Sequence, residues 1–307
     1  MKEKYVAYVG TYTHGSSIGI HLYDVNVEEG TLSERKVVPV NNSSHLAKSL
    51  NGKYLFVAGY HDGKVTVVHT HRDGRLGSVV DGVFHKGLGT VGERNFRPHV
   101  SCVRPTPDNK YLCAVDNGID QIKIYRVNGR TKRLELVDIL RCHRESGPKK
   151  IKFSKDGKFA YLIYELNNTI QVYSYDGSGK NPVFELLQTE STLASHDDET
   201  HDATSGLCMS PDGKYVFCST AGEDTVAMYK RDEQTGLLEK QCILPISGNY
   251  PKDLAIFPDG KHLAVVNHES NSITTFAIDY EKKLLIMKGK PMKVETPNSI
   301  VFSKCQE

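Results

Sequence analysis

The sequence predicts an all-β fold, a β-propeller of six four-stranded antiparallel blades, in a single domain over residues 1–307. Three observations lead to this prediction. A turn of the Ser-Pro-Asp-Gly-Lys type recurs along the chain, strand-forming residues follow each turn, and no long segment shows apolar residues at helical spacing. The repeats run end to end without a linker, so we expect one domain.

The recurring turn is read at residues 49–53, 106–110, 154–158, 210–214 and 257–261, and a sixth copy is split between the two chain ends. Successive turns are 57, 48, 56 and 47 residues apart, close to the ~40–50 residues of a propeller blade. Asp and Gly favour tight turns. We therefore interpret these positions as structural and expect Gly157 to adopt a positive φ.

The fourth unit shows the strands of one blade most clearly. Residues 149–154, 158–165 and 169–175 form three successive strand-like segments, and residues 182–189 supply a looser fourth strand. At the chain ends, residues 298–303 resemble a first strand, and residues 4–9 and 19–25 resemble a second and a third. The C-terminal strand should therefore pair into the N-terminal blade, which closes the ring and removes exposed sheet edges.

Composition excludes several kinds of partner. The net charge is +2, from 39 basic and 37 acidic residues, so it favours neither nucleic acid nor an anionic membrane. No apolar run is long enough to span a bilayer, and the first residues lack the apolar stretch of a signal peptide. Seven cysteines without a CxxC pair indicate free thiols in a reducing cytoplasm. No nucleotide-binding fingerprint is present, and no cofactor is expected.

Charged residues gather on the face opposite the recurring turns. In a propeller, the segment that leads into the first strand of a blade and the bend between its second and third strands emerge on one face. The lead-in segments carry His45, Arg94 to His99, Lys149, Lys150, His201, Asp202, Lys252 and Asp253. The bends carry Tyr12, His61, Asp62, Asp116, Asn117, Glu165, Glu223, His268 and Glu269. A concave site with cations and a few bases suits a small anionic substrate, although any one of these residues alone could be an ordinary solvated side chain.

Five segments resemble the motifs of a known family, in its order and across the whole chain. They are residues 8–13 (YVGTYT), 94–99 (RNFRPH), 147–150 (GPKK), 164–166 (YEL) and 250–253 (YPKD). They resemble the cytoplasmic lactonase family of β-propellers, which includes bacterial 6-phosphogluconolactonase and the fungal carboxymuconate-lactonising enzyme. The resemblance implies a seven-bladed ring with a lactone-processing site at its mouth.

The resemblance also implies roles for single residues, with three departures. Glu165 corresponds to the family's site carboxylate, and His99 to a site histidine. Lys149 and Lys252 stand where the family usually has arginines, and lysine lacks the paired hydrogen bonds of a guanidinium. Ser101 stands where many members have a second histidine. About one blade (~40 residues) is missing between His45 and Leu55, so we count six blades rather than seven.

The leading hypothesis is hydrolysis of a sugar-acid lactone such as 6-phosphogluconolactone. Glu165, with His99, would act as general base, and Lys149 or Lys252 would stabilise the oxyanion. Further candidates for substrate binding are Arg94, Arg97, Ser101, His201 and His268, of which the arginines would hold a phosphate or carboxylate.

Two other hypotheses stay open. A non-catalytic propeller that binds a metabolite or peptide would explain the departures at Lys149, Lys252 and Ser101. A metal-dependent lactonase would use residues 196–202 (HDDETHD), but their spacing matches no zinc or calcium motif. We therefore favour a solvated acidic loop there and expect no metal.

Overall fold

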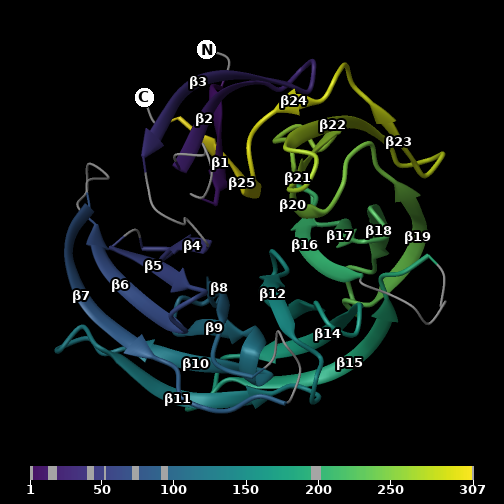
Figure 1. The fold of residues 1–307 in the computed structure, drawn as a ribbon. Helices are drawn as coiled ribbons and strands as arrows, with labels where there is room; N and C mark the ends of the chain where they lie inside the picture. The colour runs from purple at the N-terminus through teal and green to yellow at the C-terminus, as the bar shows by residue number, and fades with distance from the viewer. Residues whose placement is uncertain are drawn as a thin grey trace. The chain divides into compact units, whose positions relative to one another are not determined.

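A computed structural model describes residues 3–12, 19–39, 45–51, 53–70, 76–90, 96–194 and 202–305. These residues form 25 strands and one short 3-10 helix, arranged as six antiparallel sheets (Figure 1). Contacts between Cα atoms divide the chain into two compact units of three sheets each. Unit 1 is Met1–Ser43 with Thr192–Glu307, and unit 2 is Ser44–Ser191. None of the described residues forms a helix long and apolar enough to cross a membrane.

Unit 2 holds three blades of four consecutive strands. They are β4 (His45–Lys48), β5 (Tyr54–Gly59), β6 (Lys64–Thr70) and β7 (Leu76–Phe84); β8 (Val100–Pro105), β9 (Leu112–Asp116), β10 (Gln121–Val127) and β11 (Leu134–Arg141); and β12 (Pro148–Phe153), β13 (Phe159–Tyr164), β14 (Thr169–Asp176) and β15 (Val183–Ser191). The 3-10 helix η1 (Asn117–Ile119) follows β9. Within this unit β4, β8 and β12 are the inner strands, and β7, β11 and β15 are the outer ones (Figure 1).

Unit 1 holds the other three blades. They are β16 (Ala203–Met209), β17 (Tyr215–Ala221), β18 (Thr225–Arg231) and β19 (Leu238–Pro245); β20 (Pro251–Ile256), β21 (His262–Asn267), β22 (Ser272–Asp279) and β23 (Leu284–Met287), with β24 (Met292–Lys293) also on β22; and β25 (Pro297–Lys304), β1 (Tyr5–Thr11), β2 (Gly19–Asn26) and β3 (Thr31–Pro39). The pairing of β25 with β1 confirms that the C-terminal strand completes the N-terminal blade.

These six sheets confirm the all-β propeller fold and its count of six blades. β3 ends at Pro39 and β4 begins at His45, so only residues 40–44 connect the two blades. That connection is far too short to contain another four-stranded blade. The expected segments of the blade at 149–189 also agree with β12 to β15 to within two residues.

The second strand is almost wholly buried on both faces in four blades, at β9, β13, β17 and β21, which explains the apolar sequence of these strands. Every residue of β13 is buried. Its Leu162 packs in one cluster with Ile151 of the same blade and with Cys113 and Ile122 of the preceding blade. Apolar contact between neighbouring sheets therefore holds the blades of unit 2 together, in the manner of sheet-on-sheet packing.

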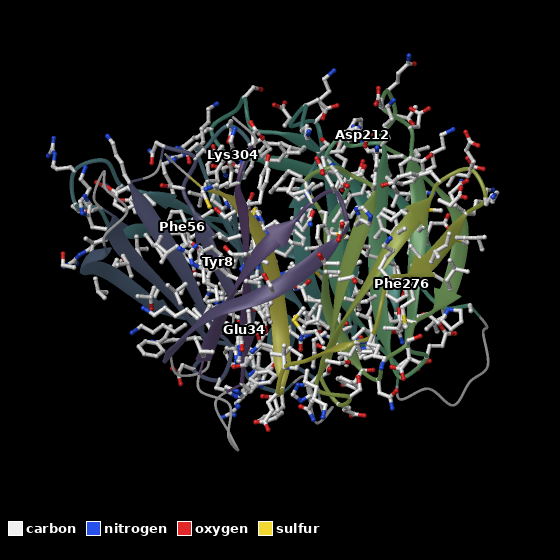
Figure 2. The ribbon with its side chains drawn as sticks, turned by 90° about the horizontal axis from the view of Figure 1, so that it is seen from above. Tyr8, Glu34, Phe56, Asp212, Phe276 and Lys304 are labelled. Atoms are coloured by element: carbon white, nitrogen blue, oxygen red, sulfur yellow. The ribbon has the colours of Figure 1, made fainter. Side chains whose placement is uncertain are left out.

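The recurring turn is held by its own side chains. The Ser210 hydroxyl donates to Asp212 Oδ1 over 2.5 Å and accepts from the N–H of Tyr215 over 2.9 Å, while Asp212 Oδ1 accepts from the N–H of Lys214 over 3.0 Å. Burial raises the pKa of Asp212, but these hydrogen bonds outweigh it and leave the pKa below its usual value. Gly157 has φ 72°, which confirms the predicted left-handed conformation. In Figure 2, Asp212 lies at the upper edge of the view, where the strands end.

A second recurring feature joins three of the blades to the blade that follows. Asp120, Asp224 and Asn271 follow a second strand and have φ of 50°, 54° and 49°. Their side chains accept hydrogen bonds from backbone N–H groups of the next lead-in segment. The bonds run from Gly147 to Asp120 (2.8 Å), from Tyr250 to Asp224 (2.7 Å) and from Thr296 to Asn271 (2.8 Å). Asp and Asn tolerate a left-handed backbone better than other non-glycine residues. One Asp or Asn therefore supplies both the left-handed turn and the side-chain acceptor for the next lead-in segment.

Replacing Asp120 with Ala is expected to lower the free energy of unfolding by about 2–3 kcal/mol, because the N–H groups of Glu145 and Gly147 lose their acceptor. Urea unfolding of the variant measures this loss. Asp120→Asn is the matched comparison, since it keeps one of the two acceptor oxygens and should lose less stability than Asp120→Ala. Equal stability of Asp120→Ala and the natural chain would contradict this role for the carboxylate.

Candidate functional site

Lys149 and Glu165 form an ion pair in unit 2. Lys149 lies in β12 and Glu165 directly follows β13, which pairs antiparallel with β12. The register shifts between Pro148 and Lys150, so Lys149 has no partner residue across the ladder, and such bulges re-aim side chains. Lys149 Nζ lies 2.9 Å from Glu165 Oε2, and the two side chains are only 14% and 5% exposed. The site is therefore centred on a shielded pair of opposite charges.

Asn117 holds the same carboxylate oxygen from the preceding blade. Its Nδ2 donates to Glu165 Oε2 over 2.9 Å and to the carbonyl of Gly147 over 3.2 Å. The N–H of Glu165 donates to that same carbonyl over 2.7 Å. Because Gly147 holds the backbone of Glu165, and Lys149 and Asn117 hold its side chain, the carboxylate has a defined direction.

His99 and Tyr60 extend the site beside Lys149. The rings of His99 and Tyr60 stack with centroids 4.7 Å apart, and Lys149 Nζ lies 5.1 Å from the centre of the Tyr60 ring. His99 Nδ1 lies 3.0 Å from the carbonyl of Tyr60. A carbonyl only accepts, so this contact requires the proton on Nδ1 and leaves Nε2 as the basic nitrogen of the neutral ring. His99 can therefore serve as a base through Nε2.

A fully buried pair anchors the backbone of His99. Asp116 Oδ1 accepts from the N–H groups of His99 (2.8 Å) and Gly118 (3.1 Å). Its Oδ2 lies 2.6 Å from His85 Nδ1, and neither side chain is exposed. The sequence singled out Asp116 only as a bend residue and missed His85. No pattern in the sequence signals this histidine, because its partner comes from the next blade.

In unit 1, as with Lys149 and Tyr60 in unit 2, a lysine ammonium lies over the face of a tyrosine ring. Lys252 Nζ lies 4.7 Å from the centre of the Tyr250 ring. The His268 ring stands edge-on to Tyr250 at 6.3 Å and to Tyr12 at 5.4 Å. Lys252 and His268 are thus brought together around Tyr250, a residue that the sequence analysis did not single out as a candidate.

Of the other residues predicted for the site, Arg97 and Ser101 lie within the described part of the chain. The Arg97 guanidinium lies 5.4 Å from the centre of the Phe96 ring. The Ser101 hydroxyl donates to the carbonyl of Lys149 over 2.8 Å and so positions the backbone of the lysine. Arg94, His201 and most of the 196–202 segment lie outside the described residues. Within the described ranges, no three His, Cys, Asp or Glu side chains could hold a metal ion.

The family model, the curated relatives and the solved structures that match this chain all point to one family. The family model described as "Lactonase, 7-bladed beta-propeller" matches residues 38–302. The 6-phosphogluconolactonase of Bacillus subtilis (strain 168) is 26% identical over 350 positions, which cover 97% of this chain and 98% of that protein. The 6-phosphogluconolactonase of Formosa agariphila is 27% identical, with 88% and 76% covered. The solved structure of the Pseudomonas aeruginosa periplasmic gluconolactonase superposes with a TM-score of 0.88 at 26% identity, covering 97% of this chain and 99% of that one.

The alignment with the Bacillus subtilis protein also bears on the blade count. It runs over 350 positions, whereas this chain has 307 residues, so at least 43 positions have no residue here. That deficit is about the length of one blade (~40–50 residues). It agrees with the six sheets of the structure.

Proposed function

Since the chain belongs to the seven-bladed β-propeller lactonase family, we propose that it hydrolyses the ring ester of a sugar-acid lactone, with 6-phosphogluconolactone as its substrate. The observation that carries the proposal is the shielded pair of Lys149 and Glu165 beside His99. A carboxylate and an ammonium in contact supply the two functions that lactone opening needs, a base for water and a cation for the developing oxyanion.

In this mechanism Glu165 takes a proton from a water molecule, and the water oxygen forms a bond to the lactone carbonyl carbon. The carbonyl oxygen becomes an oxyanion next to the Lys149 ammonium. Once Glu165 is protonated, it is neutral and no longer attracts the Lys149 ammonium. The positive charge of Lys149 is then available to stabilise the oxyanion that forms in the same step. The tetrahedral intermediate then collapses, the bond from carbon to the ring oxygen breaks, and the ring oxygen takes the proton from Glu165. The product is the open hydroxy acid.

Other residues keep the roles that the family pattern implies. His99 is proposed as a second base through Nε2, and Arg94 and Arg97 are proposed for substrate binding in unit 2. In unit 1, the family pattern implies a cation for the oxyanion at Lys252 and substrate binding by His201 and His268. Ser101 is proposed to act through the Lys149 backbone that it holds.

We place the reaction in the cytoplasm. All seven cysteines are free thiols, as is usual in a reducing compartment. Burial raises the pKa of the Cys113 thiol and of the Cys218 thiol, so both stay protonated and unreactive at neutral pH.

The purified chain is expected to accelerate opening of 6-phosphogluconolactone well above the spontaneous rate. Proton release in weakly buffered solution measures this, with the unphosphorylated lactone as a second substrate. Turnover of neither lactone would overturn the proposal. Thermal stabilisation by 6-phosphogluconate without any turnover would instead identify a propeller that only binds the sugar acid.

A further inference from the structure

Tyr60, Asn117 and Glu165 occupy the same position of the repeat in the three blades of unit 2. Each lies seven residues after the last residue of the recurring turn, at 53, 110 and 158. Each also comes directly after a second strand, Tyr60 after β5, Asn117 after β9 and Glu165 after β13. Asn117 and Glu165 are in contact, with Nδ2 and Oε2 2.9 Å apart. Tyr60 therefore stands at the position of the repeat that supplies the candidate site.

Both the backbone and the ring of Tyr60 hold His99. The carbonyl of Tyr60 accepts from His99 Nδ1 over 3.0 Å. The two rings stack with centroids 4.7 Å apart and planes inclined by 21°. The first contact fixes the tautomer of the imidazole, and the second fixes the plane of its ring. A side-chain substitution at Tyr60 removes only the second contact, so the two can be separated.

The ring of Tyr60 also contacts the cation of the site. Lys149 Nζ lies 5.1 Å from the centre of the ring, within the ~6 Å over which an aromatic face attracts an ammonium. The four-carbon stem of a lysine is flexible, so the position of Nζ depends on what the ammonium contacts. Those contacts include the Glu165 carboxylate at 2.9 Å and the Tyr60 ring.

The Glu165 carboxylate and the Tyr60 ring respond differently to the proposed reaction. Glu165 becomes neutral when it takes a proton from water, and it then no longer attracts the ammonium of Lys149. The negative face of the Tyr60 ring does not change in that step, because it arises from the π electrons of the ring. The ring therefore continues to attract Nζ while the oxyanion forms.

We propose that Tyr60 is a positioning residue for lactone opening, whose ring holds the Lys149 ammonium and the His99 imidazole in place. This role rests on the proposed function, because Lys149 and His99 are the proposed cation and the proposed second base. Tyr60 itself exchanges no proton and forms no bond with the substrate. It acts only through the two side chains that it contacts, which come from the next two blades of unit 2.

Replacing Tyr60 with Leu tests this role, because Leu keeps the backbone carbonyl and an apolar side chain but has no aromatic face. kcat for lactone opening is expected to fall about 10–100-fold, the scale of effect that follows displacement of a catalytic group by about 1 Å. KM should change much less. Tyr60→Phe keeps the aromatic face and should retain most of kcat. Tyr60→Met also lacks a ring and keeps the test valid if Tyr60→Leu fails to fold.

The matched control is Tyr54→Leu, which makes the same change at the other end of β5. The Tyr54 ring contacts Phe56 and His69 and packs against the apolar core of unit 2. Its loss removes a tyrosine ring from the same strand without touching Lys149 or His99, so kcat should equal that of the natural chain. Thermal unfolding of every variant shows how much of each protein is folded.

An NMR measurement tests the contact without the reaction. The ring current of an aromatic side chain at position 60 should shift the ε-methylene protons of Lys149 upfield in the natural chain and in Tyr60→Phe. The shift should be lost in Tyr60→Leu. Absence of the shift in the natural chain would show that the ring does not hold the ammonium, and would overturn the proposal.

The kinetic results can overturn it in two further ways. One is unchanged kcat in folded Tyr60→Leu, and the other is an equal loss of kcat in Tyr60→Leu and Tyr60→Phe. Either result in an active natural chain removes only the role of the Tyr60 ring. A natural chain that opens neither lactone would instead overturn the proposed function, and the role of Tyr60 with it.

Discussion

Replacing Glu165 with Gln is expected to lower kcat for lactone opening by about 10²–10⁴-fold, the range usual for loss of a positioned general base. Gln has nearly the same shape as Glu and can still accept hydrogen bonds from Lys149 and Asn117 through its amide oxygen. It cannot take a proton from water at neutral pH. The Michaelis constant should therefore change much less than kcat.

The matched control is Glu185→Gln, which removes a carboxylate from the exposed outer strand β15 of the same blade. Its kcat should equal that of the natural chain. Thermal unfolding of both variants separates a loss of chemistry from a loss of folded protein. Unchanged kcat in folded Glu165→Gln would remove Glu165 from the mechanism and leave His99 as the remaining candidate base.

The repeat explains why most of the fold could be predicted. Each blade depends on local signals, since the turn residues fix the first hairpin and a continuous apolar segment marks the buried second strand. The six-blade count followed from the spacing of these turns. It is confirmed by the short connection between Pro39 and His45.

The sequence could predict the pairing of Lys149 with Glu165, because both positions were expected on the same face. It could not predict the residues that hold this pair in place. Asn117 contacts Glu165 from 48 residues away, and His85 reaches Asp116 from 31 residues away, each across a boundary between blades. Such contacts depend on how two sheets pack, which a repeat pattern does not specify. The sequence did not identify Tyr60 as a site residue for the same reason, because its contacts with His99 and Lys149 also cross a boundary between blades.

Ser101 shows how a departure from the family pattern can be interpreted once packing is known. The family resemblance suggested a lost histidine at this position. The hydroxyl instead donates to the carbonyl of Lys149, and Ser205 occupies the matching position in unit 1, where its hydroxyl donates to the carbonyl of Pro251. A small hydroxyl residue thus links neighbouring inner strands in both units.

Replacing Gly118 with Ala is expected to lower the free energy of unfolding by about 3 kcal/mol or more and to lower kcat/KM at least 10-fold. A Cβ atom on Gly118 would lie 1.7 Å from the carbonyl oxygen of Arg97 and 2.9 Å from Cδ2 of His99. The nearest atom belongs to the backbone, so no side-chain rotation can relieve the clash. Overpacking of this kind usually costs about 1–3 kcal/mol and more where the neighbours cannot yield.

The loss of activity follows from the position of that clash. The segment from Arg97 to His99 must move to admit a methyl group, and it carries the imidazole that stacks on Tyr60 beside Lys149. Gly129→Ala is the matched control, because nothing lies within 4 Å of a Cβ there, and it should leave stability and kcat/KM nearly unchanged. Chemical denaturation and steady-state kinetics measure the two effects. If Gly118→Ala loses stability but keeps full kcat/KM, the position of His99 does not matter to the reaction, and Glu165 must act as base without it.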